Sequence, residues 1–520
     1  MIGTSRKSAS SRRMKTHSYL INWAVGVVMS SLAACGGGGD GGTTAAPPTS
    51  GGVPLAPAEA LVMVKVVDSS GLPLAGVTVQ RRDTLEEVTT DATGQASSRF
   101  RSAAAPGWQL YRDGLVTQVQ QSPLVSVRVA SYSQSFVMLP REEAVVHPFG
   151  AGGTVTGKHG LALTLPASAL MTPGGGSVDI NLTSIDTASS NITALPSSTF
   201  LQQPWDYNNE AILAYGAAEL VVRQSGGIIA NLIQPATLDI PLYATQHPDG
   251  RAIAVGERIA VATLDHSSLL HFNSEWHPLQ GIGDGEVIAA AGSPTGLALR
   301  VTLPPSDGAS GPLPLNAHVS AIALPGSRRI EVNVTPPAGE TLPAQSPFRL
   351  WGNVTSRGAP QAAFDYGGAL PFEIGASGVL RSLYLARSVA FEVRVEVTVG
   401  AATYFGTTQI AAATPDMSSA QVALARVAGL LPFITYPNGN ASAKIGTMVP
   451  FKVEFAGPQP DRVELYADQT LIGEVSGQRA FYTFIWNTAG LSPATRRLYA
   501  VAHGGTSSAR SGDVEVALVN

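Results

Sequence analysis

The sequence has little cysteine, charge or aromatic character. Cys35 is the one cysteine among 520 residues, so no disulfide can form within the chain. Charged residues make up 13% and aromatic residues 7% of the sequence. A helical protein would carry more Glu, Lys and Arg on its surface, so the composition argues against a mainly helical fold. The net charge of −4 comes without a block of basic residues, which argues against a nucleic-acid partner.

Several catalytic motifs are also missing. The sequence has no G-x-S-x-G nucleophile elbow, no H-E-x-x-H zinc motif and no phosphate-cradling loop. We therefore expect a protein that is not an enzyme, with no catalytic residues and no cofactor. An alternative is a hydrolase with an unrecognised site in residues 145–325. The carboxylates Asp206, Glu210 and Glu219 lie in that region, and the sequence gives no reason to pair them.

Glycine and proline are plentiful, with 55 and 36 residues. They separate short segments in which apolar and polar residues alternate, which is the pattern of strands joined by turns. A chain of this length has room for three or four domains. We therefore predict an all-β protein built from serial antiparallel β-sandwiches, each held by its own apolar core.

The N-terminal 34 residues have the layout of a secretory signal. Basic residues lie between positions 6 and 15, and a mostly apolar stretch follows at 19–34. That stretch is too short for a comfortable membrane span. It ends in Leu-Ala-Ala before Cys35, which resembles the lipobox of bacterial lipoproteins. The resemblance implies cleavage after residue 34 and a diacylglycerol on Cys35. A lone cysteine in an apolar helix is the alternative, and Arg12-Arg13 hints at the twin-arginine route.

Residues 35–58 are mainly Gly, Thr, Ala and Pro and predict a flexible tether. The predicted partner at this end is the membrane, reached through the Cys35 lipid. Gly36 stands where an Asp would resemble the inner-membrane retention signal. We therefore expect an outer-membrane or cell-surface location, and domains that face the periplasm are also compatible with it.

Residues 59–140 form the first predicted domain. An apolar strand at 61–67 leads to a D-x-x-G turn that starts at Asp68, then P-L-x-G-V-x-V, then T-D-x-x-G around Asp91. This order resembles the carboxypeptidase regulatory-like domain. The resemblance implies a small prealbumin-like β-sandwich that is an accessory module without a peptidase site. We expect Asp68 and Asp91 to cap turns; the alternative is that they bind a cation.

Residues 145–325 form the second predicted unit. A G-G-x-V pattern, an alternating strand and P-x-x-A-L at 166–170 resemble the ZU5-type β-domain. The longer series up to Trp276 is similar to the extracellular part of cartilage intermediate layer proteins.

Residues 327–428 are the third unit, for which we recognise no family. Residues 391–399 are apolar at every odd position and polar at every even one. This alternation predicts a strand with one face buried and the other in water.

Residues 430–520 resemble a bacterial immunoglobulin-like domain. The segment 463–473 follows V-x-L-Y-x-D-x-x-x-I-G, and 482–488 follows Y-x-F-x-W-N-T. The resemblance implies another β-sandwich with Trp486 in its core. The alternative for this Trp is a sugar-stacking role.

Two further groups could bind a ligand. His271, Glu275 and His277 share parity and would share a strand face, as a metal site of imidazoles and a carboxylate requires. His266 has the other parity, and we expect an exposed strand face without a metal. The aromatic and polar loop at 205–209 could contact a sugar or a partner chain, or simply pack at the domain edge.

The features together predict a non-catalytic, lipid-anchored envelope protein. Its sandwiches would serve adhesion, protein–protein interaction or envelope structure, with an unknown protein or glycan as partner. The main alternative is a carbohydrate-binding surface lipoprotein, which would need exposed aromatic residues in a row. The segment 430–520 lies farthest along the chain from Cys35, so we expect it to meet the partner.

Overall fold

Strands account for nearly all the regular structure in this computed structural model. Among the described residues the other regular element is one 3-10 turn, η1 (Lys158–Gly160). The prediction of an all-β fold is confirmed. No helix in the described part of the chain is long and apolar enough to cross a membrane. The structure describes residues 59–101, 107–121, 131–170, 176–188, 195, 200–201, 210–224, 227–228, 232–265, 277–278, 285–305, 315–356, 358–370, 378–415, 418–437 and 441–520.

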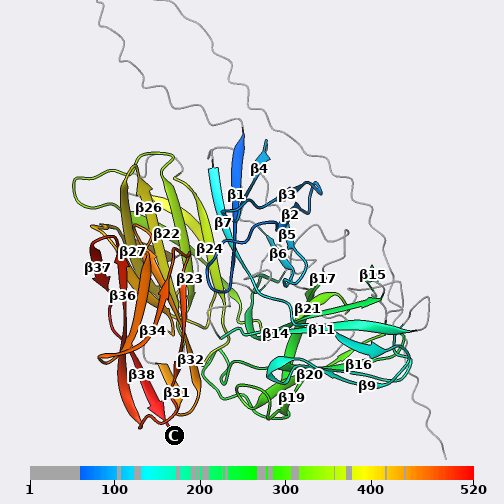
Figure 1. Cartoon of the computed structure of the whole chain (residues 1–520). Coiled ribbons are helices and arrows are strands. Elements are labelled where there is room, and N and C mark those ends of the chain that lie inside the picture. The colour runs from blue at the N-terminus through cyan, green and yellow to red at the C-terminus, as the bar shows by residue number, and fades with distance from the viewer. Residues whose placement is uncertain are drawn as a thin grey trace, which may run out of the picture. The chain divides into compact units, whose positions relative to one another are not determined.

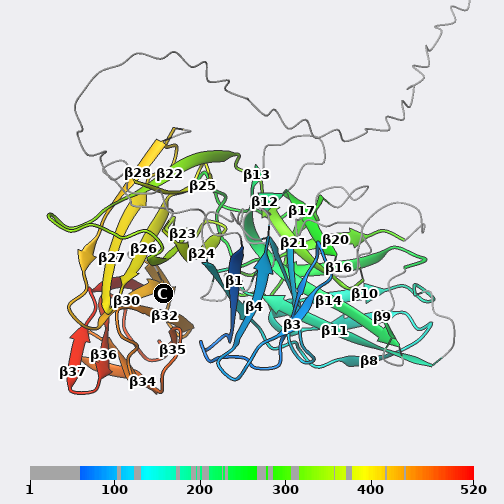
Figure 2. The same ribbon diagram turned by 90° about the horizontal axis from the view of Figure 1, so that it is seen from above.

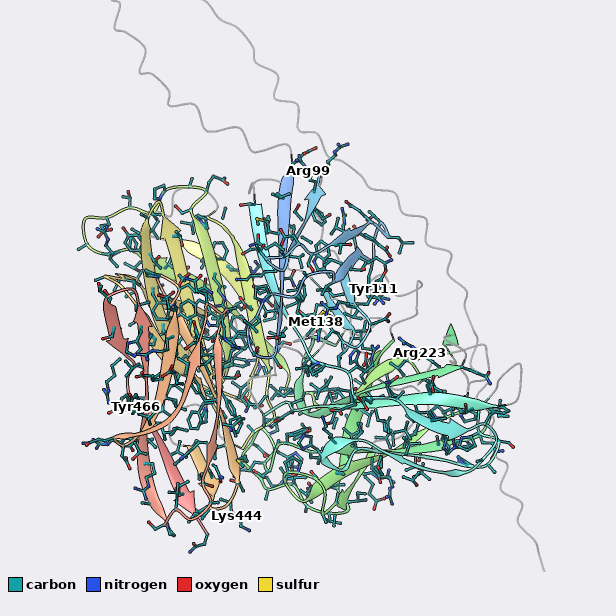
Figure 3. All side chains as sticks on the ribbon, in the orientation of Figure 1. Arg99, Tyr111, Met138, Arg223, Lys444 and Tyr466 are labelled. Carbon is teal, nitrogen blue, oxygen red and sulfur yellow. The ribbon has the colours of Figure 1, made fainter. Side chains whose placement is uncertain are left out.

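The first module, residues 59–140, contains two sheets. Its strands are β1 (Ala60–Asp68), β2 (Thr78–Arg81), β3 (Glu87–Thr89), β4 (Gln95–Phe100), β5 (Gly107–Tyr111), β6 (Gln118–Gln121) and β7 (Ser131–Met138). The orders are β4-β1-β7 and β3-β2-β5-β6. Their inner faces share a core that includes Trp108, Phe136 and Met138, and Figure 3 shows Met138 in the interior of the side-chain packing.

The second module, residues 145–325, is built on one long sheet. Its strands are β8 (Val145–Pro148), β9 (Gly153–Thr156), β10 (Ala162–Leu165), β11 (Ser177–Ile185), β12 (Phe200–Leu201), β13 (Glu210–Ala211), β14 (Leu213–Gln224), β15 (Gly227–Ile228), β16 (Ala236–Pro241), β17 (Arg258–Asp265), β18 (His277–Pro278), β19 (Gly285–Ala289), β20 (Leu297–Leu303) and β21 (Ala317–Ala323). The described path runs β8-β11-β14-β21-β17-β19-β20-β16-β10-β9. Val155 and Ile180, near opposite ends of this path, belong to one core, so the sheet folds over on itself.

The third module, residues 327–428, pairs a three-stranded sheet with a five-stranded one. Its strands are β22 (Ser327–Thr335), β23 (Pro347–Val354), β24 (Ala363–Ala369), β25 (Val379–Ala386), β26 (Phe391–Val399), β27 (Ala402–Ile410), β28 (Ser418–Ala423) and β29 (Ala425–Arg426). The orders are β25-β22-β28 and β24-β23-β26-β27-β29. Val393 and Val395 on β26 point into the core between the sheets, as the alternation predicts.

The fourth module, residues 430–520, is a sandwich of a three-stranded and a six-stranded sheet. Its strands are β30 (Leu431–Tyr436), β31 (Ala441–Lys444), β32 (Met448–Ala456), β33 (Arg462–Ala467), β34 (Thr470–Ser476), β35 (Tyr482–Asn487), β36 (Ala494–Gly504), β37 (Ser507–Arg510) and β38 (Val514–Val519). Trp486 lies in its core against Phe451, with ring centroids 6.3 Å apart. The prediction of a core role for this Trp is therefore confirmed.

Most strand pairs are antiparallel, as predicted, but some are not. β1 pairs parallel with β7, β22 with β28, and β31 with β38. In each case an early strand of a module meets a late one. The two ends of each of these three modules are thereby joined within one sheet (Figure 1).

The two aspartates of the first module cap turns, as predicted. Asp68 Oδ1 accepts hydrogen bonds from the N–H groups of Ser70 and Leu72 at 2.8 and 3.0 Å. Asp91 Oδ1 accepts equivalent bonds from the N–H groups of Thr93 and Gln95. Their carboxylates are used by the turn backbone, which is what a capping role requires.

Candidate functional site

The polar face of β26 is covered by the fourth module. The sequence predicts that Glu392, Arg394 and Glu396 face water, but Arg394 is only 2% exposed. Phe433 on β30 lies over this face, with the Arg394 guanidinium 5.8 Å from its ring centroid. The expectation of a solvated face is therefore wrong at Arg394, whereas Glu392 and Glu396 on the same face are half-buried. The alternation identifies which side chains leave their own core, and it cannot identify a second module that covers them.

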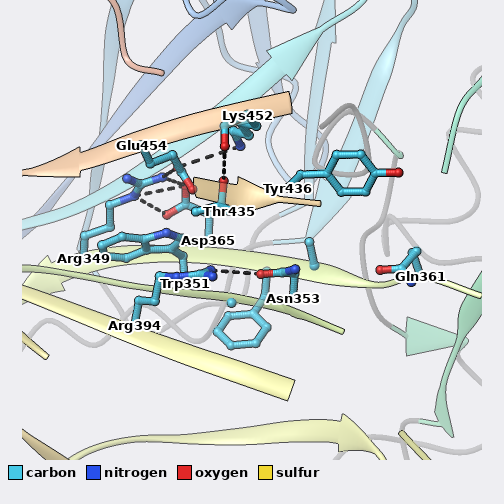
Figure 4. A pocket seen from close by; sticks show the side chains of 13 residues that line it. Arg349, Trp351, Asn353, Gln361, Asp365, Arg394, Thr435, Tyr436, Lys452 and Glu454 are labelled. Carbon is cyan, nitrogen blue, oxygen red and sulfur yellow. Dashed lines mark hydrogen bonds and ion pairs between the residues drawn. The ribbon is translucent and has the colours of Figure 1, made fainter. Parts of the chain in front are cut away.

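Opposite charges meet where the two modules pack, and we call this group the charged junction. It consists of Arg349, Asp365 and Arg394 from the third module with Lys452 and Glu454 from β32 (Figure 4). Arg349 Nη2 lies 2.7 Å from Asp365 Oδ2 and 3.2 Å from Glu454 Oε1. Lys452 Nζ lies 3.7 Å from the same Glu454 oxygen. One guanidinium thus bridges carboxylates of two modules.

An aromatic group flanks the charged junction. Trp351 on β23 and Phe405 on β27 have ring centroids 6.0 Å apart, and Phe433 on β30 stacks on Phe405 at 5.0 Å. The Arg349 guanidinium lies 4.2 Å from the centroid of the Trp351 ring. The contact between Arg349 and Trp351 adds a cation–π interaction within the third module to the ion pairs.

The charges at the junction depend on one another. Burial alone would raise the pKa of Glu454, but Lys452, Arg349 and Arg394 lower it to about 2. Burial lowers the pKa of Lys452. At the cavity edge, burial raises the pKa of Glu396. Glu454 is therefore a carboxylate at neutral pH because three cations surround it.

The junction has the chemistry of a clamp between modules. Its cavity measures about 40 Å³, which is room for very few water molecules. Each of the carboxylates Asp365 and Glu454 lies against a guanidinium, so neither is placed as a general base. Thr435, which lines this cavity together with Tyr436, donates its hydroxyl hydrogen to the Lys452 carbonyl oxygen at 3.4 Å. A larger cavity of about 300 Å³ adjoins it and brings in Lys65 of the first module.

A buried ion pair joins the end of the first module to the second. The Arg141 guanidinium contacts both Glu219 oxygens at 2.7 Å, and the Thr117 N–H donates to Glu219 Oε1 at 2.9 Å. Glu219 lies on β14 and is 1% exposed. Its carboxylate is held by Arg141 and by the Thr117 N–H, so it joins the first module to the second.

The D-x-x-G turn of the first module contacts the fourth. The N–H of Ala480 donates to the carbonyl oxygen of Gly71 at 2.9 Å. Gly71 has φ +81°, and a Cβ at this position would lie 2.5 Å from the Phe481 carbonyl oxygen. Glycine is thus required here for two reasons: the backbone is left-handed, and two segments of the chain approach closely.

A common apolar core lies between the modules. It draws on the first, second and fourth modules, and we call it the inter-module core. Its buried members are Val67, Val116, Val119, Val137, Leu139, Ile185, Leu195, Ile212, Ala214, Ala217, Ala262, Leu264, Ile322 and Phe481. β7 also lies beside β24 of the third module (Figures 1 and 2). The residues 56–520 belong to one compact unit, which the picture of separate domains in series does not predict.

Most of the residues that the sequence suggests for ligand binding lie outside the part of the chain that the structure describes. Cys35, His271, Glu275 and the loop at 205–209 lie outside the described residues. The backbone of His277 pairs with Thr263 in β18 and β17, and its side chain is not described. Within the described residues no group of three or more His, Cys, Asp or Glu side chains could hold a metal ion. The predicted absence of a metal remains a prediction.

Sequence reasoning missed the residues of the charged junction. Lys452 and Glu454 were visible as the polar positions of an alternating strand, and Arg349 and Asp365 occupy equivalent positions in the third module. The sequence does contain a signal. Strands of two different modules carry opposite charges on the face that is turned away from their own apolar core. No local pattern identifies which two strands will meet.

The comparisons with known proteins do not add a function. No family model matches the chain, and no curated protein matches it. The fibronectin(III)-like modules of CbhA from Clostridium thermocellum are 10% identical, cover 36% of this chain and 89% of their own, and have a TM-score of 0.15. A titin Ig tandem is 12% identical over 37% of this chain and 96% of its own, also at 0.15. BcpA, the major pilin subunit of Bacillus cereus, is 8% identical over 89% of this chain and 98% of its own, at 0.15. Because these TM-scores are so low, the assignment as a multi-domain β-sandwich protein depends on the strand pairing described above.

Proposed function

We propose that this chain is a lipid-anchored envelope protein with a non-catalytic role in structure or protein–protein interaction. The observation that carries the proposal is the packing of its modules. Buried charges and a common apolar core join them, and the charged groups that were identified hold modules together. Charged residues that hold modules together favour a structural role over a catalytic one.

The packing of the modules argues against the expectation that the segment 430–520 meets the partner by itself. The fourth module contacts the first through Phe481 and the third through the charged junction. The fourth module therefore packs against the first module, which directly follows the predicted tether in the sequence. We propose that a partner meets a surface composed of several modules, and that the last module alone is not the contact.

The lipid anchor is tested by metabolic labelling with palmitate. Cells that produce the chain should incorporate label, and Cys35→Ala should abolish incorporation because it removes the one thiol. Ser50→Ala in the tether is the matched control and should keep the label. Continued labelling of Cys35→Ala would rule out the proposed anchor.

The orientation is tested by protease treatment of intact cells. If the modules face outward, the chain should be cleaved in intact cells and in lysed cells alike. If cleavage needs lysis, the protein acts in the periplasm, and an adhesive role at the cell surface is excluded.

A further inference from the structure

A polar cleft lies where the second, third and fourth modules meet. Its volume is about 710 Å³, within the range of about 300–1,000 Å³ typical of small-molecule sites. It is distinct from the charged junction, although Gln361 and Tyr436 line both cavities. In Figure 4 these two side chains lie apart from the group formed by Arg349, Asp365 and Glu454.

The described lining of this cleft is polar but carries no Asp, Glu, Lys or Arg. Its polar side chains are hydroxyls and amides, and apolar residues complete the walls. The polar members are Tyr243, Thr245, Gln246, Thr355, Ser356, Gln361, Tyr436 and Ser442. Burial raises the pKa of Tyr243 and of Tyr436, so both phenols stay protonated and uncharged at neutral pH.

The walls are fixed by hydrogen bonds between modules. The N–H groups of Thr245 and Gln246 donate to the Gly358 carbonyl oxygen at 3.1 and 3.0 Å. The backbones of Ala214 and Gln361 exchange two hydrogen bonds at 3.0 and 3.1 Å. A wall held in this way loses little conformational freedom when a ligand binds, which favours affinity.

Several groups in the lining are positioned for a ligand. The Gln361 Nε2 donates to the Ala359 carbonyl oxygen at 2.9 Å, and this bond orients the amide with its oxygen as the remaining acceptor. The hydroxyls of Thr355, Tyr436 and Ser442 make no hydrogen bond to another described residue, and each can both donate and accept. The cleft therefore offers mixed donors and acceptors from two modules.

This lining selects by chemistry among three classes of ligand. A charged ligand would lose its hydration without gaining a counter-charge from the residues that line the cleft, which is costly. An anionic ligand would in addition be repelled by Asp186, whose charge acts on both Tyr243 and Tyr436. An apolar ligand would leave hydroxyls and amides without partners. A neutral ligand with many hydroxyls satisfies both requirements, and its C–H surfaces can pack on the tyrosine rings.

We propose that this cleft binds a short neutral oligosaccharide. The binding would depend on the junction of three modules and would use Thr355, Tyr436 and Ser442 as hydrogen-bonding groups. The inference does not depend on the lipid anchor, because the described lining residues belong to the second, third and fourth modules.

The test is isothermal titration calorimetry on the full-length chain in detergent. The neutral probes are maltotriose, cellotriose and triacetylchitotriose, and trigalacturonic acid is the charged probe. We expect at least one neutral probe to bind and the charged probe to bind more weakly. Failure of all three neutral probes, or tighter binding of trigalacturonic acid, would overturn the proposal.

Variants then locate the site. Thr355→Lys and Ser442→Lys place a cation in the lining from the third and from the fourth module, and each should weaken binding by about tenfold or more, since a buried charge without a partner is unfavourable. Ser508→Lys, on the exposed strand β37, is the matched control and should bind like the unaltered chain. Tyr436→Phe keeps the ring, removes one hydroxyl and should weaken binding by a smaller factor.

Circular dichroism melting confirms that each variant is folded before its titration is interpreted. Tyr436→Phe keeps the test valid if a lysine variant fails to fold. If the folded wall variants bind as well as Ser508→Lys, the cleft is not the site and the proposal fails. Palmitate labelling is unaffected by any of these results, so failure here is distinguishable from failure of the proposed anchor.

Discussion

At the scale of single residues, Glu454 is the most constrained group in the charged junction. It is 2% exposed and lies between Lys452 and Arg349. Removing one partner from a buried ion cluster leaves uncompensated charge, whereas removing an exposed partner costs little. The same substitution should therefore have very different effects at buried and exposed glutamates.

We expect Glu454→Gln to lower the free energy of unfolding by about 3–5 kcal/mol. Urea denaturation followed by tryptophan fluorescence measures this, since Trp351 lies at the junction. Glu474→Gln is the control, because Glu474 pairs with Arg462 on an exposed face and its loss should cost at most about 1 kcal/mol. Equal effects of the two substitutions would contradict a structural role for the junction.

The lowered pKa of Glu454 also predicts a pH dependence. Its pKa falls from 4.5 to about 2 on folding, so the folded state favours the ionised form. The resulting stabilisation is complete above pH 4.5 and is lost as the pH falls toward 2. Between these values the stability of Glu454→Gln should fall less steeply than that of the unaltered chain, as measured by urea titrations at each pH. Parallel curves would exclude this assignment.

At the scale of elements, the D-x-x-G turn has two functions. Asp68 caps it, and Gly71 allows Phe481 to approach. Gly76 offers a matched comparison, because it also has positive φ (+72°) but a Cβ there would meet nothing within 4 Å. A comparison of substitutions at Gly71 and Gly76 separates the free-energy cost of backbone strain from the cost of the close contact with Phe481.

We expect Gly71→Ala to destabilise the protein by about 1–3 kcal/mol more than Gly76→Ala, because only the first forces two modules apart. Chemical denaturation of both variants measures the difference. If the two substitutions cost the same, the turn does not press against the fourth module in solution.

At the scale of the whole molecule, the inter-module core predicts cooperativity. Phe481 belongs to the fourth module in sequence, yet it is buried with Val67 and Val137 of the first. Modules that share a core should unfold together, whereas modules tethered in series would melt independently.

Phe481→Ala should weaken this coupling by about 3–5 kcal/mol, the usual cost of removing a buried phenylalanine. Calorimetry should then show a broadened or divided transition. Ile485→Ala is the control, because Ile485 is 60% exposed and its loss should change stability by about 0.5 kcal/mol or less. A divided transition already present in the unaltered chain would show that the modules are not coupled.

The strands and turns of this protein can largely be predicted from its sequence. Alternation identified strands such as 391–399, and D-x-x-G and T-D-x-x-G identified turns. The motif around 482–488, which resembles an immunoglobulin-like strand, placed Trp486 in a core. These features depend on neighbours along the chain, since side-chain direction in a strand and turn capping are local properties. The lipid anchor predicted at Cys35 belongs to the same kind of local signal.

What covers the outward face of each strand, the face turned away from its own core, follows from the packing of whole modules. Arg394 is a polar position of an alternating strand and was expected to face water, but it is buried because the fourth module packs over it. The cleft that joins Thr245, Thr355 and Ser442 likewise exists only where three modules converge. Such contacts depend on the shapes and charges of whole faces, and no stretch of neighbouring residues contains that information.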